Sequence, residues 1–97
     1  MTKQTGCQVL IVGAGITGLT IARELLRVGA EDILILEKEN SLGFHASGRN
    51  SGVLHAGIYY TVDTLKARFC VKGNRLMKEF CQEKGLTLKE TGKVIVA

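Results

Sequence analysis

Aromatic residues and proline are scarce in this 97-residue sequence. It has no proline and no tryptophan, and phenylalanine and tyrosine together make up 5% of the chain. The net charge is +4, but the basic residues are scattered among acidic ones, as in Arg23-Glu24 and Glu37-Lys38-Glu39. Because nucleic-acid binding typically needs clustered positive charge and aromatic side chains for base stacking, we expect no nucleic-acid partner.

Cysteines are few as well. Cys7, Cys70 and Cys81 are an odd number and lack the C-x-x-C spacing of redox or metal sites. If Cys70 and Cys81 share a helix, they lie about 16 Å apart along its axis. A disulfide tolerates only about 7 Å between Cα atoms, so this pair is not expected to bridge. We expect reduced, buried thiols in a reducing compartment, and no metal site.

Charged residues are missing from residues 4–22, as in a signal peptide or a membrane anchor. However, Gly6, Gly13, Gly15 and Gly18 interrupt the stretch, and its apolar pattern changes period partway along. A membrane helix would keep one helical pattern, so we predict a strand, a turn and a helix, and no transmembrane span. No signal or transit peptide is expected, because only about six residues precede the predicted strand.

The length of the chain is sufficient for one small domain. The sequence stops at residues 93–97, a β-branched run with no turn or polar tail after it. A strand at this position would need neighbouring strands that the chain does not supply. The sequence therefore indicates a truncated or split protein.

Two short apolar runs, residues 9–12 and 33–36, are typical of parallel strands buried on both faces of a sheet. Between them the apolar residues take helical spacing from Ile16 onward, and Gly29 is expected to end that helix. A strand, a helix and a strand within about 30 residues predict a right-handed βαβ unit. We therefore expect an α/β fold that begins with a Rossmann-like unit.

Residues 40–60 combine four glycines with both polar and apolar residues. Because the apolar residues argue against a flexible linker, we predict an ordered, ligand-facing loop with a short helix.

A long amphipathic helix is expected over residues 65–84, capped by Thr64 and ended by Gly85. Its basic residues would suit a partner or membrane helix, but its apolar stripe favours packing against other parts of the protein. Two further strands are expected at residues 86–90 and 93–97.

The main chemical signal is a G-x-G-x-x-G pattern, which reads Gly13-Ala14-Gly15-Ile16-Thr17-Gly18. Gly13 permits a tight turn, Gly15 lets the backbone approach a diphosphate, and Gly18 lets helix and strand pack closely. The free N–H groups at the start of the helix would hold the phosphates. Glu37, at the end of the second strand, is expected to accept a hydrogen bond from a ribose 2′-OH, which disfavours NADP. The alternative is a plain glycine-rich turn.

A second signal follows in residues 44–57. Small residues there would let a short helix approach a ligand: Ser47, Gly48, Ser51 and Gly52. Asn50 and Ser51 also offer hydrogen-bond donors and acceptors. A simple nicotinamide enzyme has no need of such a segment, whereas an extended FAD needs contacts along its ribityl chain and ring edge. We predict cofactor contact here, with an ordinary polar loop as the alternative.

With these motifs the chain resembles the glycine/D-amino-acid-oxidase-like family of FAD-dependent oxidoreductases. Within that family it is most similar to oxidases and dehydrogenases of L-2-hydroxyglutarate. The resemblance rests on the glycine turn, on Leu36-Glu37-Lys38-Glu39, and on residues 50–60, 65–70 and 92–97. The pattern G-x-N-S-G-V-x-H-A-G-x-Y-Y in the middle is the most specific part.

The resemblance implies FAD as cofactor, a small 2-hydroxy acid as substrate, and its oxidation to the 2-oxo acid. Electrons would pass to oxygen or to a membrane quinone pool. Residues 1–97 would then be part of an FAD-binding domain, because that domain and a substrate domain together need about 300 residues. We expect this fragment to be inactive alone. A cytoplasmic location is expected, with peripheral attachment to the inner membrane as the alternative.

The residues expected to contact FAD lie in the two glycine-rich segments and at the end of the second predicted strand. They are Gly13, Ala14, Gly15, Ile16, Thr17, Gly18, Glu37, Lys38, His45, Ser47, Gly48, Asn50, Ser51, Gly52 and Val53.

The two histidines have different expected roles. His45 matches the place where related amine dehydrogenases join a histidine to the flavin in a W-H-A-x-G setting, but Phe44 replaces the tryptophan. Covalent attachment, noncovalent contact and a plain loop position all remain open. His55 is a candidate general base for an alcohol O–H, and a structural histidine is an equal alternative. Arg49 is expected to be a surface residue, with a contact to a diphosphate or to a substrate carboxylate as the alternative.

Two other functions are compatible with the same sequence. One is an amine or amino-acid oxidase of the same family, which uses FAD on a C–N bond. The other is a nucleotide-binding module without catalysis.

Overall fold

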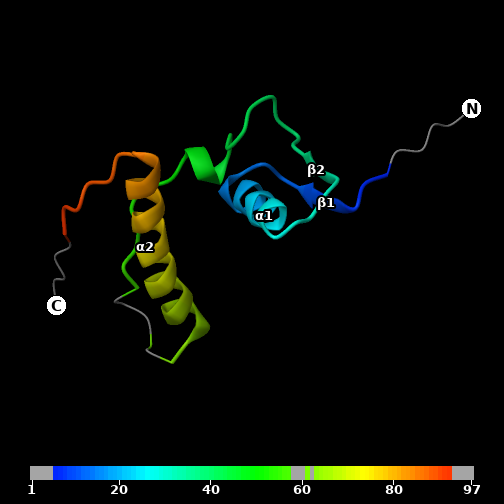
Figure 1. Ribbon diagram of the computed structural model, residues 1–97. Helices are drawn as coiled ribbons and strands as arrows, with labels where there is room; N and C mark the ends of the chain where they lie inside the picture. The colour runs from blue at the N-terminus through cyan, green and yellow to red at the C-terminus, as the bar shows by residue number, and fades with distance from the viewer. Residues whose placement is uncertain (1–5, 58–60, 62, 93–97) are drawn as a thin grey trace, which may run out of the picture. The chain divides into compact units, whose positions relative to one another are not determined.

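The computed structural model describes residues 6–57, 61 and 63–92. In chain order its elements are β1 (Val9–Val12), α1 (Ile16–Arg27), β2 (Ile33–Leu36), the short 3-10 helix η1 (Ala46–Gly48) and α2 (Leu65–Lys84) (Figure 1). The chain divides into two compact units, Met1–Gly52 and Val53–Ala97. The predicted α/β order of the elements is confirmed.

The first unit is built on two parallel strands connected through α1. β1 pairs with β2 from Val9 opposite Ile33 to Val12 opposite Leu36. The strands are four residues each, as the apolar runs predicted. Parallel neighbours need a crossover connection, and α1 with its flanking turns supplies it (Figure 1).

The two faces of the β1–β2 sheet differ in exposure. Val9, Ile11, Ile33 and Ile35 are half-buried, and Ile11 lies against the start of α1 at Gly18. The alternate residues face the other way and are exposed, with Val12 at 82%. The prediction that both strands are buried on both faces is therefore wrong for this chain. Among the described residues, α1 covers one face and the opposite face has no comparable cover.

The helix α1 ends as expected. Its last turn closes through Val28, whose N–H donates to Glu24 O, and Gly29, whose N–H donates to Leu26 O. Ala30 N–H donates to Leu25 O, which satisfies a further helix carbonyl. The chain then enters β2 within a few residues.

The predicted bounds of the long helix are confirmed at both ends. The Thr64 hydroxyl caps α2 by accepting from Ala67 N–H at 3.2 Å, and Gly85 is the left-handed residue that ends it. Among the apolar residues of α2, Leu65 and Phe69 remain exposed, at 64% and 69%. That these side chains pack against other parts of the protein stays a prediction.

The chain after α2 differs from the expectation. Residues 86–90 form no strand, so that prediction is wrong. A strand needs a hydrogen-bonded neighbour, and none of the described residues pairs with this segment. The second expected strand, residues 93–97, lies outside the described residues.

The sequence predicted no disulfide and no membrane-spanning helix. Cys7, Cys70 and Cys81 are all unbonded and half-buried, and the latter two lie on α2 as expected. In the part of the chain that the structure describes, no helix combines the length and hydropathy needed to cross a bilayer.

Two glycines near α2 predict opposite effects of the same substitution. Gly73 lies inside α2 with nothing within 4 Å of the position of a Cβ, so Gly73→Ala should stabilise the fold by about 0.5–1 kcal/mol. Gly57 has a φ of +81°, and a Cβ there would lie 3.1 Å from Val71 Cγ2. Gly57→Ala should therefore destabilise the chain by about 1–3 kcal/mol. Urea unfolding of both variants checks this, and equal shifts would contradict it.

Candidate cofactor site

The glycine-rich segment forms the corner between β1 and α1. β1 ends at Val12, Gly13 has a φ of +108°, and α1 starts at Ile16. The Gly13 N–H donates to Leu36 O at 2.7 Å, which ties the corner to the end of β2. A positive φ is open to glycine at little cost, so the sequence pattern and the turn agree.

Gly18 brings the first turn of α1 against this corner. A Cβ on Gly18 would collide with the Gly13 carbonyl oxygen and would lie 3.2 Å from Ile11 Cγ2. The obstacle is mainly backbone, which has little freedom to move. This is the close helix–strand approach expected of the third glycine in the motif.

Glu37 reaches the same corner from the end of β2. Its Oε1 accepts from Ala14 N–H at 3.0 Å, and its Oε2 accepts from Glu39 N–H at 2.8 Å. The Ala14 contact lowers the pKa of Glu37 most, followed by the Glu39 contact, and nearby His45 and Lys38 lower it further. Each carboxylate oxygen has more than one acceptor site, so two backbone donors leave room for a sugar hydroxyl.

The loop after β2 also contacts the glycine turn. Ser47 Oγ accepts from Ile16 N–H at 2.8 Å, and Gly43 N–H donates to Ala14 O at 3.0 Å. These contacts bring residues more than 25 positions apart in the sequence to one place. The predicted short helix is present as η1, which carries Ser47 and Gly48.

Asn50 orders the end of this loop. Its Nδ2 donates to the carbonyl oxygens of Ala46 and Ser47, each at 3.0 Å, and its Oδ1 accepts from Gly52 N–H at 2.7 Å. These contacts of Asn50 are local, so its side chain stabilises η1 and the turn that follows. Whether it also contacts the cofactor stays a prediction.

His45 lies beside an acidic group and an aromatic ring. Its Nε2 is 3.0 Å from Glu39 Oε1, and its ring meets Phe44 edge-on with 5.0 Å between centroids. The Arg49 guanidinium lies over the Phe44 ring, 4.6 Å from the ring centroid. Arg49 is exposed, as expected, and makes a cation–π contact that the sequence did not indicate.

Val53 and His55 belong to the second unit, whereas the other predicted contact residues belong to the first. The Asn74 side-chain amide on α2 donates to His55 O at 3.1 Å and to Leu54 O at 3.4 Å. This fixes the backbone at His55, whose side chain is exposed. The catalytic role of His55 stays a prediction.

The site residues that sequence reasoning missed are Gly43 and Glu39. Gly43 docks on Ala14 through its N–H, and Glu39 contacts both His45 and the Glu37 carboxylate. A signal for Gly43 was present, since Gly43 and Gly48 repeat the spacing of Gly13 and Gly18. No local pattern indicates the Glu39 contacts, because they depend on how the loop folds back.

The corner fits the diphosphate and ribose of a dinucleotide. An α-helix leaves its first N–H groups without acceptors inside the helix, here at Gly15, Ile16, Thr17 and Gly18. α1 has no acidic residue in its first turn to neutralise its positive end. The Glu37 carboxylate, at the adjacent strand end, lies on this corner, where a ribose hydroxyl would need an acceptor.

Comparison with protein families agrees with this geometry. Residues 8–97 match a family model described as FAD dependent oxidoreductase, named DAO. The chain belongs to this family. The prediction of FAD as cofactor and the predicted family are thereby confirmed.

Several curated proteins are similar to this family member. It is 52% identical over 90 residues to a protein of Homo sapiens named L-2-hydroxyglutarate dehydrogenase, mitochondrial. That match covers 92% of this chain and 19% of the human protein. The chain is 46% identical over 89 residues to L-2-hydroxyglutarate dehydrogenase of Escherichia coli K12, covering 91% of this chain and 21% of that protein. The chain thus spans about a fifth of the length of these relatives.

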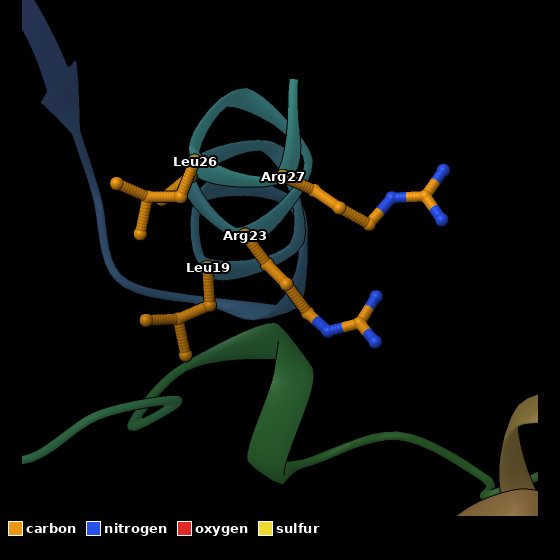
Figure 2. Close-up of a pocket in the computed structure, with 5 residues that line it drawn as sticks. Leu19, Arg23, Leu26 and Arg27 are labelled. Carbon is orange, nitrogen blue, oxygen red and sulfur yellow. The ribbon is translucent and has the colours of Figure 1, made fainter. Parts of the chain in front are cut away.

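A shallow, open hollow lies on α1 beyond the glycine turn. It is lined by Leu19, Ala22, Arg23, Leu26 and Arg27. Figure 2 shows the two leucines pointing to one side of the helix and the two arginines to the other. None of these residues is among those predicted to hold FAD, and Arg27 pairs with Glu24 at 3.0 Å.

The lowered pKa of Glu37 predicts a pH dependence of stability in this family member. Because the folded pKa lies below its ordinary value of 4.5, the contribution of Glu37 is present at neutral pH. It is lost as the pH falls from 4.5 through the folded pKa. Glu37→Gln, which does not titrate, should flatten this part of the stability curve. Urea unfolding between about pH 6 and pH 3 measures it, with exposed Glu31→Gln as the control. Identical slopes for the two variants would contradict the prediction.

Proposed function

We propose that this chain holds FAD for an enzyme that oxidises L-2-hydroxyglutarate, or a similar 2-hydroxy acid, to the 2-oxo acid. Membership of the FAD-dependent oxidoreductase family supports the cofactor. The names of the relatives at 46–52% identity support the substrate. The observation that carries the proposal is the Glu37 carboxylate, bound to the Ala14 N–H of the glycine turn at 3.0 Å.

The residues proposed to hold FAD divide by position. The glycine turn, residues 13–18, would approach the diphosphate, and the N–H groups at the start of α1 that have no acceptor inside the helix would donate to it. Glu37 would accept from the adenosine ribose, with Lys38 next to it. The loop residues His45, Ser47, Gly48, Asn50, Ser51, Gly52 and Val53 would line the cofactor beyond the diphosphate.

When bound, FAD supplies the hydride acceptor, and the protein supplies orientation and a proton acceptor. His55 is proposed to accept the hydroxyl proton of the substrate. Its backbone is fixed by Asn74 on α2, which leaves the exposed imidazole free to face a ligand. Oxygen or a membrane quinone would receive the electrons afterwards, in a cytoplasmic protein or one attached to the membrane surface.

The test separates cofactor binding from turnover. The purified chain should acquire flavin absorption bands with FAD, and NADH or NADPH should not compete. Supplied with L-2-hydroxyglutarate, the 97-residue chain should show no enzyme-like turnover, whereas a protein of the relatives' length containing it should reduce its flavin. Rapid turnover by the short chain would contradict the proposal, and so would flavin reduction by amino acids in place of 2-hydroxy acids.

A further inference from the structure

The loop after β2 repeats the geometry of the glycine turn. Gly13 and Gly43 both have a positive φ, +108° and +63°. A Cβ on Gly18 would collide with the Gly13 carbonyl oxygen, and a Cβ on Gly48 would collide with the Gly43 carbonyl oxygen in the same way. Residues 43–48 therefore form a second glycine turn, with η1 where the first turn has the start of α1.

The second glycine turn lies directly on the first. Gly43 N–H donates to Ala14 O at 3.0 Å, and Ser47 Oγ accepts from Ile16 N–H at 2.8 Å. A Cβ on Gly15 would lie 2.9 Å from Ser47 Oγ, so the absence of a side chain at Gly15 permits this approach. Gly15 thus serves the contact between the two turns as well as an approach to phosphate.

Ser47 caps the start of α1 from a distant position in the sequence. The N-cap residue is Gly15, which has no side chain and makes no side-chain cap hydrogen bond. An N-cap side chain normally accepts from the N–H of the second or third helical residue, whereas the Ser47 hydroxyl accepts from Ile16, the first residue of α1. This hydroxyl comes from 31 positions further along the chain. The Ile16 N–H is therefore satisfied by the protein, while the helix start still presents the N–H groups of Thr17 and Gly18.

We propose that the second glycine turn is a positioning element that sets the N-terminus of α1 in place before a diphosphate binds. Ser47 and Gly48 act through the first turn: Ser47 holds the Ile16 N–H, and Gly48 lets η1 close on Gly43. An arrangement fixed in advance lowers the entropic cost of ordering the site on binding. This inference rests on the proposed FAD-holding role of the first turn.

The test begins with the full chain without FAD. Ser47→Ala should speed hydrogen exchange at the Ile16 amide by about tenfold or more, relative to the Ile35 amide in β2, because the acceptor is removed. Ser47→Thr, which keeps a hydroxyl, should restore most of the protection. Ser41→Ala, the same chemical change at an exposed loop serine, is the matched control. Unchanged exchange in Ser47→Ala, or equal loss in the alanine and threonine variants, would overturn the inference.

A second measurement keeps the result independent of folding and of the proposed function. The exchange of Ile35 reports whether a variant is folded, and Gly48→Ala should speed Ile16 exchange as Ser47→Ala does. FAD titration should then show about tenfold weaker binding for both variants than for Ser41→Ala. If the unsubstituted chain binds no FAD, the proposed function fails, whereas the exchange result still decides whether Ser47 positions α1. Weaker binding without faster Ile16 exchange would make Ser47 a direct ligand only and overturn the positioning role.

Discussion

Gly18→Ala should abolish measurable FAD binding, with an affinity loss of more than about 100-fold, and should lower the free energy of unfolding by roughly 2–4 kcal/mol. The added Cβ would collide with the Gly13 carbonyl oxygen and press on the Ile11 side chain. Relief requires α1 to move away from β1 or the turn at Gly13 to open. Either movement displaces the N–H groups at the start of α1 from where a diphosphate would meet them. Flavin titration and urea unfolding measure the two effects.

Gly6→Ala is the control for the Gly18 substitution. It makes the same chemical change where nothing lies within 4 Å of the position of a Cβ. We expect it to leave both FAD affinity and stability nearly unchanged. An FAD affinity of Gly18→Ala within a few-fold of that control would mean that close packing at Gly18 does not shape the site.

Glu37→Ala should weaken FAD binding by about 10- to 100-fold. The substitution removes the acceptor for Ala14 N–H in the glycine turn and for Glu39 N–H at the start of the following loop. It also removes the proposed acceptor for the adenosine ribose. We therefore expect a larger loss than one ribose hydrogen bond alone would give. Isothermal titration with FAD provides the affinity.

A comparison of ligands separates the two roles of Glu37. A ribose contact alone predicts that Glu37→Ala weakens FAD and ADP strongly and leaves the affinity for inorganic diphosphate unchanged. Loss of the Ala14 contact predicts that diphosphate affinity falls as well, because the turn itself is altered. Glu31→Ala, at an exposed carboxylate before β2, is the matched control. Equal FAD affinities in the Glu37 and Glu31 variants would contradict both roles.

The local elements of this chain follow from short-range sequence features. Four-residue apolar runs gave β1 and β2, and the Thr64 cap with Gly85 gave the bounds of α2. Glycine spacing predicted the turn between β1 and α1. These features depend on residues within a few positions of one another, so a sequence pattern contains most of the necessary information.

The segment after α2 shows that such patterns are not sufficient to predict a strand. Residues 86–90 alternate as a strand would, but a strand exists only with a hydrogen-bonded neighbour, and the described residues supply none. The prediction that β1 and β2 are buried on both faces is wrong for a related reason. Their apolar composition suits two covered faces, whereas α1 covers one of them.

The sequence by itself therefore determined the strand–turn–helix corner, the family and the identity of the acidic residue that follows β2. Only the tertiary structure decided what that corner contacts: Glu37 on Ala14, Ser47 on Ile16 and Gly43 on Ala14. The reason is that single hydrogen bonds between distant residues leave no periodic trace in a sequence. They depend on the path of the loop between residues 37 and 48, which packing and turn geometry set together.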